Sequence, residues 1–389
     1  MKFDFDEYIN REGTDCIKYD FRQLYFGRND VIPMWVADMD FRTPDFVLDA
    51  VRNRTNHPVL GYSFRSDTYH NAIINWLQLR HQWTIKNKWI SFSPGVVPGL
   101  TLAVTAFTNP GDKIIVQPPV YFPFYTSIEG TGREIIYNPL KLKNGRYYFD
   151  FEDLKTKINK NVKMLILCSP HNPGGMVWKE DELKQLTKIC LEKKILILSD
   201  EIHSDLILRP NKHIPLACIS EDIAQQVITF MSPSKTFNMA ALSTAYAIIS
   251  NTQLKKQYDH IVEYHHLHIG NVFGNIALTA AYSHGSEWLD QMLEYVKANI
   301  EYVVDFFKNK LPDIKVIQPE GTYLIWIDFR DTGLSHTQIK DKLIYKAKVG
   351  LNDGVTFGIG GEGFFRMNVA CPRATVTESI KRIFQVFDK

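Results

Sequence analysis

Three polar residues follow apolar runs of the chain and could together carry out chemistry. Lys235 follows the run QVITF in the segment MSPSKTFN, Asp200 ends the run KILILSD, and Asn172 follows VKMLILC in the segment CSPHNPGG. A lysine amine can form a Schiff base with an aldehyde, and a carboxylate can keep a pyridine nitrogen protonated. Each residue alone also has an ordinary explanation, as a surface lysine, part of a buried ion-pair network or a turn asparagine.

A glycine-led helix start and an aromatic residue extend this set. Gly95, Val96 and Val97 precede the apolar stretch PGLTLAVTAF, and the backbone N–H groups at a helix start can bind a phosphate. Tyr121 lies in PPVYFPFY, again just after an apolar run. An aldehyde, a pyridine ring and a phosphate occur together in pyridoxal 5′-phosphate. The residues therefore predict a pyridoxal-phosphate site.

The elements that must position these residues alternate along the chain. Short runs rich in Ile, Val and Leu predict strands buried on both faces, and helix-like stretches such as KEDELKQLTKICLEKK separate several of them. This alternation predicts an α/β fold with a mostly parallel central sheet and helices on both faces. Ligands of such sheets bind beyond the carboxyl ends of the strands. The predicted strands are DKIIVQPP, REIIYNPL, VKMLILCSP, KILILSDE, QVITFMS and STAYAIIS.

The pattern changes near residue 288. The segment 288–310 predicts one long amphipathic helix, and strands and helices follow it to the end of the chain. We therefore expect a large cofactor-binding domain at 46–286. The segments 1–45 and 287–389 are expected to form a smaller α+β domain.

Motifs along nearly the whole chain resemble those of the class I/II aminotransferase superfamily of fold-type I pyridoxal-phosphate enzymes. More narrowly, the chain resembles the MalY/PatB-type cystathionine β-lyases, which are C–S lyases. The opening PMWVADMDF and the pair DEIH and SKTFN indicate this lyase branch. The motifs are PMWVADMDFRTP, GYSFR, SPGVVPGL, HNPGG, SDEIHSDL, SPSKTFN and GFFRMNVACPR.

The resemblance implies a role for each residue around the cofactor ring. Lys235 matches the Schiff-base lysine that also moves protons, and Asp200 matches the partner of the pyridine nitrogen. Asn172 matches the donor to the ring oxygen, and Tyr121 matches the ring that stacks on the cofactor. His203 stands where many aminotransferases carry a tyrosine. Lys235, Tyr121 and Asp200 are the expected catalytic residues.

The resemblance also implies a phosphate site shared between two subunits. The N–H groups of Val96 and Val97, at the Gly95 turn, match its backbone part. Tyr62 of GYSFR matches a tyrosine that reaches the phosphate from the neighbouring subunit, which implies a homodimer with shared active sites. The hydroxyl groups expected to bind the cofactor belong to Ser232 and Ser234.

For the substrate, the resemblance implies an arginine and an N-terminal lining segment. Arg366 matches the arginine that binds the α-carboxylate through two parallel hydrogen bonds, and Asn172 is expected beside it. The lining residues are expected to be Trp35, Val36 and Ala37.

The motifs leave more than one activity open. A lyase expels a thiolate from the β-carbon and yields a thiol, pyruvate and ammonia, whereas an aminotransferase keeps the amino group on the cofactor. Typical aminotransferases carry a glycine and an arginine where this chain has Ala241 and Ser243, which favours the lyase. A lyase acting on L-cystathionine, and on L-cysteine or related S-substituted cysteines, is the leading prediction. An aminotransferase is the alternative, and a non-enzymatic cofactor-binding regulatory protein is the second alternative.

The composition of this 389-residue chain indicates which classes of partner and which cellular location to expect. With 45 Lys and Arg against 43 Asp and Glu, the formal net charge is +2, and no dense basic patch predicts nucleic-acid binding. The N-terminus MKFDFDEYIN has no apolar core of signal-peptide type, and no run approaches the ~20 apolar residues of a membrane span. The five scattered cysteines, without a C-x-x-C pair, indicate reduced thiols and a cytoplasmic location.

One histidine cluster invites a metal-binding interpretation. The segment EYHHLH would place His265 and His268 on one face of a helix. Further ligands at zinc-like spacing are missing from the sequence, so we expect no metal site.

Overall fold

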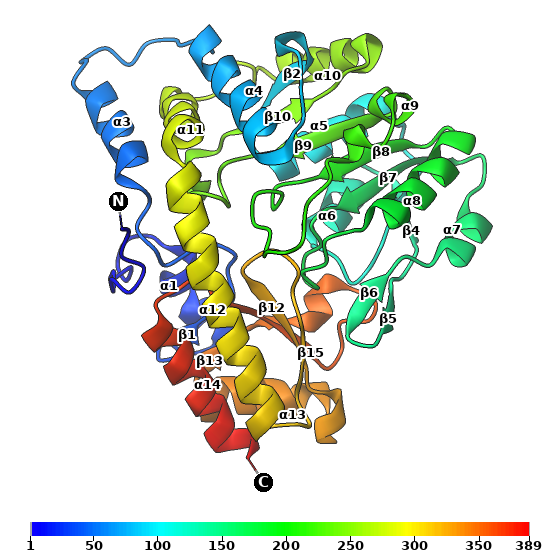
Figure 1. Ribbon diagram of the computed structural model, residues 1–389. Helices are drawn as coiled ribbons and strands as arrows, with labels where there is room; N and C mark the ends of the chain where they lie inside the picture. The colour runs from blue at the N-terminus through cyan, green and yellow to red at the C-terminus, as the bar shows by residue number, and fades with distance from the viewer. Residues whose placement is uncertain (1, 389) are drawn as a thin grey trace.

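The computed structural model describes residues 2–388, and a seven-stranded sheet forms the centre of its larger part (Figure 1). β10 pairs antiparallel with both of its neighbours, and the pairs among the remaining strands are parallel. The predicted mostly parallel sheet is therefore confirmed. In spatial order the strands are β2 (Ile90–Ser93), β10 (Ala245–Ile248), β9 (Val227–Met231), β8 (Leu196–Asp200), β7 (Val162–Cys168), β3 (Lys113–Val116) and β4 (Glu134–Tyr137).

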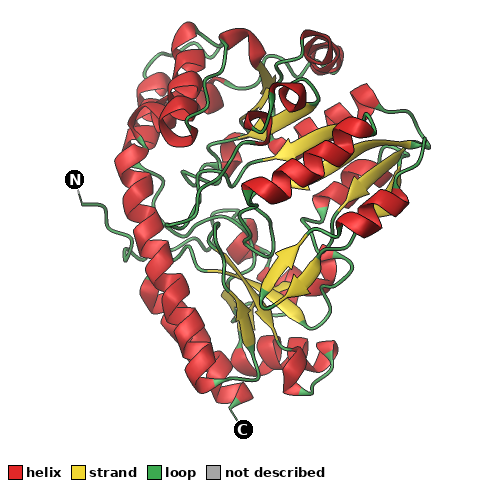
Figure 2. Cartoon of the chain, turned by 45° about the vertical axis from the view of Figure 1, so that its right-hand side comes forward, coloured by secondary structure: helices red, strands yellow, loops and turns green. Residues whose placement is uncertain are grey.

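Helices cover both faces of this sheet (Figure 2). Successive residues of a strand point to opposite faces. Ile197 accordingly packs in one core with Leu186, whereas Leu198 packs in another with Leu100. The sheet is therefore buried on both sides, as its runs of Ile, Val and Leu predicted. The helices of this part are α3 (Asp45–Thr55), α4 (Asp67–His81), α5 (Val96–Phe107), α6 (Pro123–Glu129), α7 (Phe151–Lys157), α8 (Glu180–Glu192), α9 (Glu221–Ala224), α10 (Thr252–Tyr264) and α11 (Val272–His284).

The long helix α12 (Ser286–Lys310) runs from the larger part to the end of the molecule where the C-terminus lies (Figure 1). A four-stranded sheet packs beside it, in the order β11 (Lys315–Ile317), β12 (Leu324–Asp328), β15 (Phe364–Asn368) and β14 (Asn352–Asp353). The remaining helices here are α1 (Ile17–Asp20), α2 (Arg22–Phe26), α13 (His336–Asp341), a π-helical segment (Lys342–Ala347) and α14 (Arg373–Phe387).

The N-terminal segment lies with this C-terminal part. β1 (Ile32–Pro33) pairs in parallel with β13 (Val349–Gly350). Elsewhere in the chain, β5 (Lys141–Lys143) and β6 (Arg146–Tyr148) form a separate antiparallel hairpin. One apolar core joins α12 and α14 to residues of α3, α4 and α11. The domain limits 46–286, and 1–45 with 287–389, stay a prediction.

Short 3₁₀ turns span Asn87–Trp89, Leu216–Cys218, Ala240–Leu242, Arg330–Thr332 and Gly354–Phe357.

The histidine segment differs from its expected form. α10 ends at Tyr264, and His266 adopts a left-handed backbone with φ 56°, so His265 and His268 do not share a helical face. Within residues 2–388, no group of three or more His, Cys, Asp or Glu side chains is placed to hold a metal ion.

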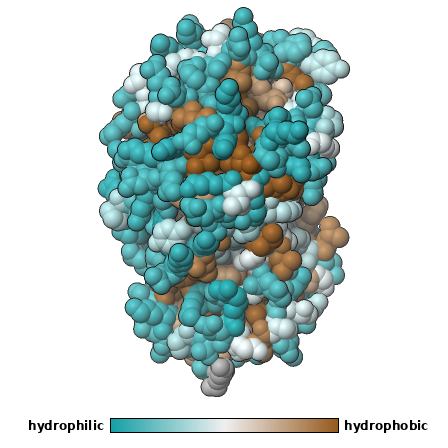
Figure 3. Space-filling model, turned by 90° about the vertical axis from the view of Figure 1, so that its right-hand side faces the viewer, coloured by the Kyte–Doolittle hydropathy of each residue, from teal (hydrophilic) through white to brown (hydrophobic). Residues whose placement is uncertain are grey.

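The exterior agrees with a chain that buries its apolar elements. Seen from the right-hand side of Figure 1, the surface is mostly hydrophilic, and apolar residues gather in its upper half (Figure 3). None of the helices that the structure describes is both long and apolar enough to cross a membrane.

Candidate active site

The carboxyl ends of three neighbouring strands bring Lys235, Asp200 and Asn172 to one cavity of about 190 Å³. Asp200 ends β8 and pairs with Cys168 of β7 and Phe230 of β9, so the loops that carry Asn172 and Lys235 start on either side of it. The cavity is lined by Ala37, Val96, Val97, Pro98, Tyr121, Cys168, Asn172, Asp200, Ile202, His203, Ser234, Lys235 and Ala240.

Lys235 lies in this cavity and its amine donates a hydrogen bond to the carbonyl oxygen of Ala37 at 2.7 Å. Burial lowers the pKa of Lys235 to about 8; the charge of Arg366 acts in the same direction, whereas Asp38 and Asp200 oppose it. Near neutral pH a useful fraction of this amine is therefore uncharged. A general base requires such a fraction.

Asp200 is a buried carboxylate without a cationic hydrogen-bond partner among the described residues. Its Oδ1 accepts a hydrogen bond from the backbone N–H of Ile202 at 3.1 Å. Burial raises the pKa of Asp200 to about 7 and Glu201 adds to this effect, whereas the backbone hydrogen bond and Lys235 lower it. A carboxylate in this environment is stabilised by a positive charge in the adjoining cavity.

Arg366 does not itself line the cavity but is hydrogen-bonded to Asn172, which does. Arg366 Nη1 donates to the side-chain oxygen of Asn172 at 2.9 Å, which leaves the amide NH₂ group of Asn172 as a donor. Arg366 Nη2 donates to the carbonyl of Trp35 at 2.8 Å and to the side-chain oxygen of Asn352 at 3.0 Å, while its Nε has no partner in residues 2–388. Burial lowers the pKa of Arg366 to about 10. Its guanidinium is a cation with an unused donor.

His203 is buried beside Tyr323 and lines the same cavity. Its Nδ1 has no hydrogen-bond partner within the described chain. Burial lowers the pKa of His203 to about 3, and the charges of Lys235 and Arg366 act in the same direction. The imidazole is therefore neutral at physiological pH.

Of the residues expected to bind the phosphate, some line the cavity and others do not. Val96 and Val97 begin α5 and line the cavity, and Gly95 caps this helix without a side-chain hydrogen bond, so the first N–H groups remain available. Ser234 also lines the cavity. Ser232 does not, because its hydroxyl donates to the carbonyl of Thr244 at 2.7 Å and accepts from the N–H of Ser234 at 3.1 Å.

Tyr62 lies outside the cavity of its own chain. Its side chain is 95% exposed, and the exposed residues Val59, Leu60 and Phe64 lie in the same loop between α3 and α4. This placement leaves Tyr62 free to contact a second molecule.

The N-terminal segment that contains Trp35, Val36 and Ala37 closes one side of the cavity. The Ala37 carbonyl accepts from Lys235 and, at 2.9 Å, from the hydroxyl of Tyr323. The side-chain amide of Asn368 donates to the carbonyl of Val36 at 2.7 Å. The segment therefore contacts the site mainly through its backbone, and its side chains Trp35 and Val36 do not line the cavity.

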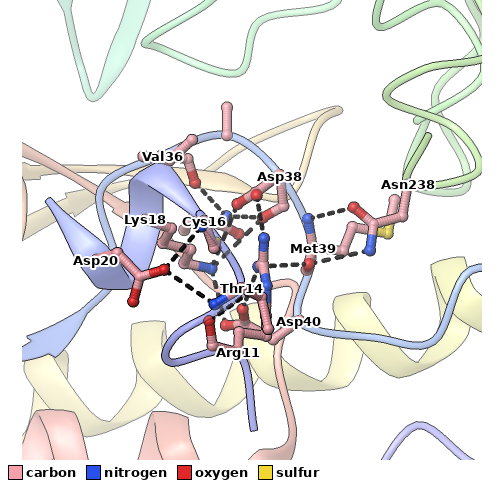
Figure 4. Close-up of polar contacts among 12 residues, drawn as sticks. Arg11, Thr14, Cys16, Lys18, Asp20, Val36, Asp38, Met39, Asp40 and Asn238 are labelled. Carbon is pink, nitrogen blue, oxygen red and sulfur yellow. Dashed lines mark hydrogen bonds and ion pairs between the residues drawn. The ribbon is translucent and has the colours of Figure 1, made fainter. Parts of the chain in front are cut away.

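An ion cluster that the sequence did not reveal holds this segment in place (Figure 4). Arg11 donates to Asp38 at 2.5 Å and to Asp40 at 2.7 Å. Lys18 donates to Asp40 at 2.8 Å, and its side chain is only 1% exposed. Asn238, in the Lys235 loop, makes paired hydrogen bonds with the backbone of Met39 at 3.0 Å. The cluster and Asn238 together fix the segment next to Lys235.

A mostly parallel α/β sheet with a lysine, an aspartate and a helix start around a cavity at its carboxyl edge defines a fold-type I pyridoxal-phosphate enzyme. A family model of class I and II aminotransferases matches residues 29–383. Cystathionine beta-lyase PatB of Bacillus subtilis (strain 168) is 43% identical over 380 residues, which is 97% of this chain and 98% of that protein.

Two solved structures are similar over the whole chain. A PLP-bound putative aminotransferase from Clostridium difficile 630 is 42% identical, with a TM-score of 0.97 and coverage of 100% of both chains. Cystalysin from Treponema denticola, which contains a pyridoxal 5′-phosphate cofactor, is 37% identical, with a TM-score of 0.96 and coverage of 99% of both chains. The chain belongs to the class I and II aminotransferase family, and the predicted likeness to its MalY/PatB-type C–S lyases is confirmed.

The groups that lack partners around the cavity fit pyridoxal phosphate. Asp200 is a buried carboxylate that needs a cation, as a protonated pyridine nitrogen is, and His203 Nδ1 is an unpartnered polar atom. The uncapped start of α5 fits a phosphate. Lys235 completes the set as an amine with a lowered pKa.

Proposed function

We propose that this protein is a pyridoxal-phosphate-dependent C–S β-lyase that cleaves L-cystathionine by α,β-elimination. The products are a thiol, pyruvate and ammonia. The observation that carries the proposal is the position of Lys235, an amine with a pKa of about 8 in the cavity that Asp200 and Asn172 also line. L-Cysteine and related S-substituted cysteines belong to the same proposed substrate class.

We assign the cofactor to the residues whose groups suit its parts. Asp200 would hold the pyridine nitrogen, Asn172 the ring oxygen, and Tyr121 would stack on the ring face, with His203 beside it. The N–H groups of Val96 and Val97 and the hydroxyl of Ser234 would hold the phosphate. Ser232 remains a proposed member of this set, and in the structure its hydroxyl donates to the carbonyl of Thr244.

The remaining residues act on the substrate. When bound, pyridoxal phosphate supplies a ring that accepts electrons from the substrate α-carbon. The Lys235 amine takes the α-proton, and its lowered pKa allows it to do so near neutral pH. Arg366 binds the substrate α-carboxylate. That anchor would orient the α-carbon for proton removal by the Lys235 amine.

The positions of the arginines favour an elimination reaction over the transfer of an amino group between two dicarboxylic acids. Such an aminotransferase needs a second cation for the distal carboxylate. Arg42 is bound to Glu7, Arg65 donates to the carbonyl of Ile269, and Arg373 donates to Asn299. Among the described residues, none of these arginines is hydrogen-bonded to a residue that lines the cavity, whereas Arg366 donates to the lining residue Asn172. This arrangement supports the lyase over the aminotransferase.

We also propose a homodimer in which Tyr62 reaches the active site of the partner subunit. The exposed loop that carries Tyr62 and Phe64, with exposed fractions of 95% and 83%, supports this proposal. The proposed location is the cytoplasm, on the evidence of the scattered cysteines.

The proposed function is tested by giving the purified holoenzyme either L-cystathionine or an amino-acid/2-oxoacid pair. The lyase predicts thiol and pyruvate from L-cystathionine, with slow amino-group transfer in the second reaction. Brisk transfer without thiol release from any S-substituted cysteine would instead establish the aminotransferase. Absence of both, in a protein that still binds the cofactor, would favour the regulatory alternative.

A further inference from the structure

Thr236, the residue after Lys235, is held by a buried carboxylate on the far side of the lysine loop. The Thr236 hydroxyl donates to Asp205 Oδ2 at 2.9 Å. Both side chains are buried, and neither lines the cofactor cavity. This contact joins the loop after β9 to the loop after β8.

Asp205 is itself fixed by two residues of α4. Trp76 Nε1 donates to Asp205 Oδ1 at 3.0 Å, and His81 Nε2 lies 2.9 Å from the same oxygen. Trp76 stacks on Tyr282 with ring centroids 4.9 Å apart, so α4 is anchored to α11 at this point. Although burial opposes it, the hydrogen bonds from His81 and Thr236 hold the pKa of Asp205 below its ordinary value. A satisfied, ionised carboxylate therefore sits between α4 and the lysine loop.

Asp205 does not face the reacting groups. It lines a separate cavity of about 500 Å³ together with His81 and His213. The carboxylates that raise the pKa of Lys235 are Asp38 and Asp200. The contact with Thr236 is the hydrogen bond that joins Asp205 to the lysine loop.

We propose that Asp205 is a positioning residue, which sets the place of the Lys235 amine by holding the hydroxyl of the adjacent Thr236. Neighbouring Cα atoms are about 3.8 Å apart, so a shift of Thr236 moves the lysine directly. Misplacement of a reacting group by about 1 Å can cost ~100-fold in rate. Asn238 holds the same loop from the opposite side, through Met39. This proposal rests on the proposed function in one respect: the proposed function assigns proton transfer to Lys235.

The test uses Thr236→Val, which removes the hydroxyl at nearly constant volume, and Thr236→Ser, which keeps it. Asp205→Asn weakens the same contact from the other side. The matched control is Glu182→Gln, because Glu182 also accepts several hydrogen bonds, from Arg146 and from the backbone of Lys179, far from the lysine loop.

Two quantities are measured on each cofactor-loaded variant: the steady-state constants with L-cystathionine, and the pH titration of the visible absorbance of lysine-bound cofactor. We expect Thr236→Val and Asp205→Asn to lower kcat at least about tenfold with KM changed less than about threefold, because Arg366 is untouched. The titration midpoint shifts in both variants. Thr236→Ser and Glu182→Gln keep wild-type values, and the double variant Asp205→Asn/Thr236→Val is no worse than Asp205→Asn alone.

Wild-type kcat and titration midpoint in Thr236→Val would overturn the proposal. An unaltered midpoint in a folded Asp205→Asn, with only a smaller active fraction, would also overturn it by showing a merely structural role. If Asp205→Asn does not fold, the comparison of Thr236→Val with Thr236→Ser decides. The titration needs no substrate, so it decides the positioning role even if the wild-type protein releases no thiol.

Discussion

The amine of Lys235 and the carbonyl oxygen of Ala37 lie 2.7 Å apart, although the two residues are 198 positions apart in the chain. Lys235 follows a strand of the large sheet, whereas Ala37 belongs to the N-terminal segment that packs with the C-terminal part of the molecule. The residue that we propose to move the proton is therefore in contact with both parts of the structure. Relative movement of the two parts changes the surroundings of that amine.

Replacement of Lys235 by Ala removes the proposed base and the attachment point of the cofactor. We expect kcat to fall at least ~1,000-fold, since both the covalent and the proton-transfer roles are lost. The visible absorbance that bleaches with borohydride should disappear, and mass spectrometry after reduction should find no cofactor on the chain. A reducible adduct that persists in Lys235→Ala would show that another lysine carries the cofactor.

Asp200 predicts a specific pH dependence of stability in the protein without cofactor. Burial raises its pKa to about 7 in the folded state, so between about pH 4 and pH 7 the folded state binds more protons than the unfolded state. The free energy of unfolding therefore falls as the pH rises through this range. Asp200→Asn removes that loss, and we expect the variant to gain ~2–4 kcal/mol relative to wild type between pH 4 and pH 8.

Urea unfolding of both cofactor-free proteins at pH 5 and pH 8 measures this difference. Added pyridoxal phosphate should reverse the ranking at pH 8, because the carboxylate then has a cationic partner. An equal stability difference at both pH values would contradict the assigned environment of Asp200.

Arg366→Lys tests the proposed carboxylate site. A lysine cannot reproduce two parallel hydrogen bonds, so we expect KM for L-cystathionine to rise by about 10- to 100-fold. The absorbance of the bound cofactor should stay unchanged. Arg373→Lys is the control, because Arg373 donates to Asn299 outside the cavity. Equal effects of the two replacements would rule out a specific role for Arg366.

The ion cluster at the N-terminal segment should contribute to stability because Lys18 is buried. Lys18→Met leaves Asp40 with Arg11 as its remaining ionic partner, and we expect the free energy of unfolding to fall by about 3 kcal/mol. The exposed pair of Lys315 and Asp331 offers the comparison. Lys315→Met should cost much less, because both of its charges are solvent-exposed. Similar losses in the two variants would contradict the proposed contribution of the buried cluster.

Shared active sites predict complementation between two inactive variants. Tyr62→Ala and Lys235→Ala should each lose most activity, for different reasons. After unfolding and refolding of an equal mixture, hybrid dimers contain one complete site, so the mixture should recover about a quarter of wild-type activity. A mixture no more active than its parents would show that Tyr62 does not serve the partner's site.

The sequence allowed much of the fold to be predicted because the central strands are continuous apolar runs. β7 and β8 are almost fully buried, and Asn172, Asp200 and Lys235 lie at or just after strand ends, where a parallel sheet collects them. The strand propensity and the apolar pattern of the sequence were sufficient to predict these strands. The end of α10 was missed because the apolar pattern does not show that the chain leaves the helix at His265.

Other parts of the site could not be read from the sequence. Arg11 and Lys18 lie 29 and 22 positions before Asp40 in the chain, and only the folded chain brings them together with it. The hydroxyl of Ser232, predicted to bind the phosphate, also donates to the carbonyl of Thr244, a contact that depends on tertiary packing. Asp205 was present in the motif SDEIHSDL, yet its contact with Thr236 depends on how two loops pack.

The most direct test of the central claim is the stoichiometry of products formed from L-cystathionine by the pure holoenzyme without any added 2-oxoacid. Elimination predicts continuous formation of homocysteine, pyruvate and ammonia in equal amounts over many turnovers, abolished in Lys235→Ala. Product formation that stops after one equivalent per active site, with the amino group retained on the cofactor and no free thiol, would contradict the lyase and identify an aminotransferase.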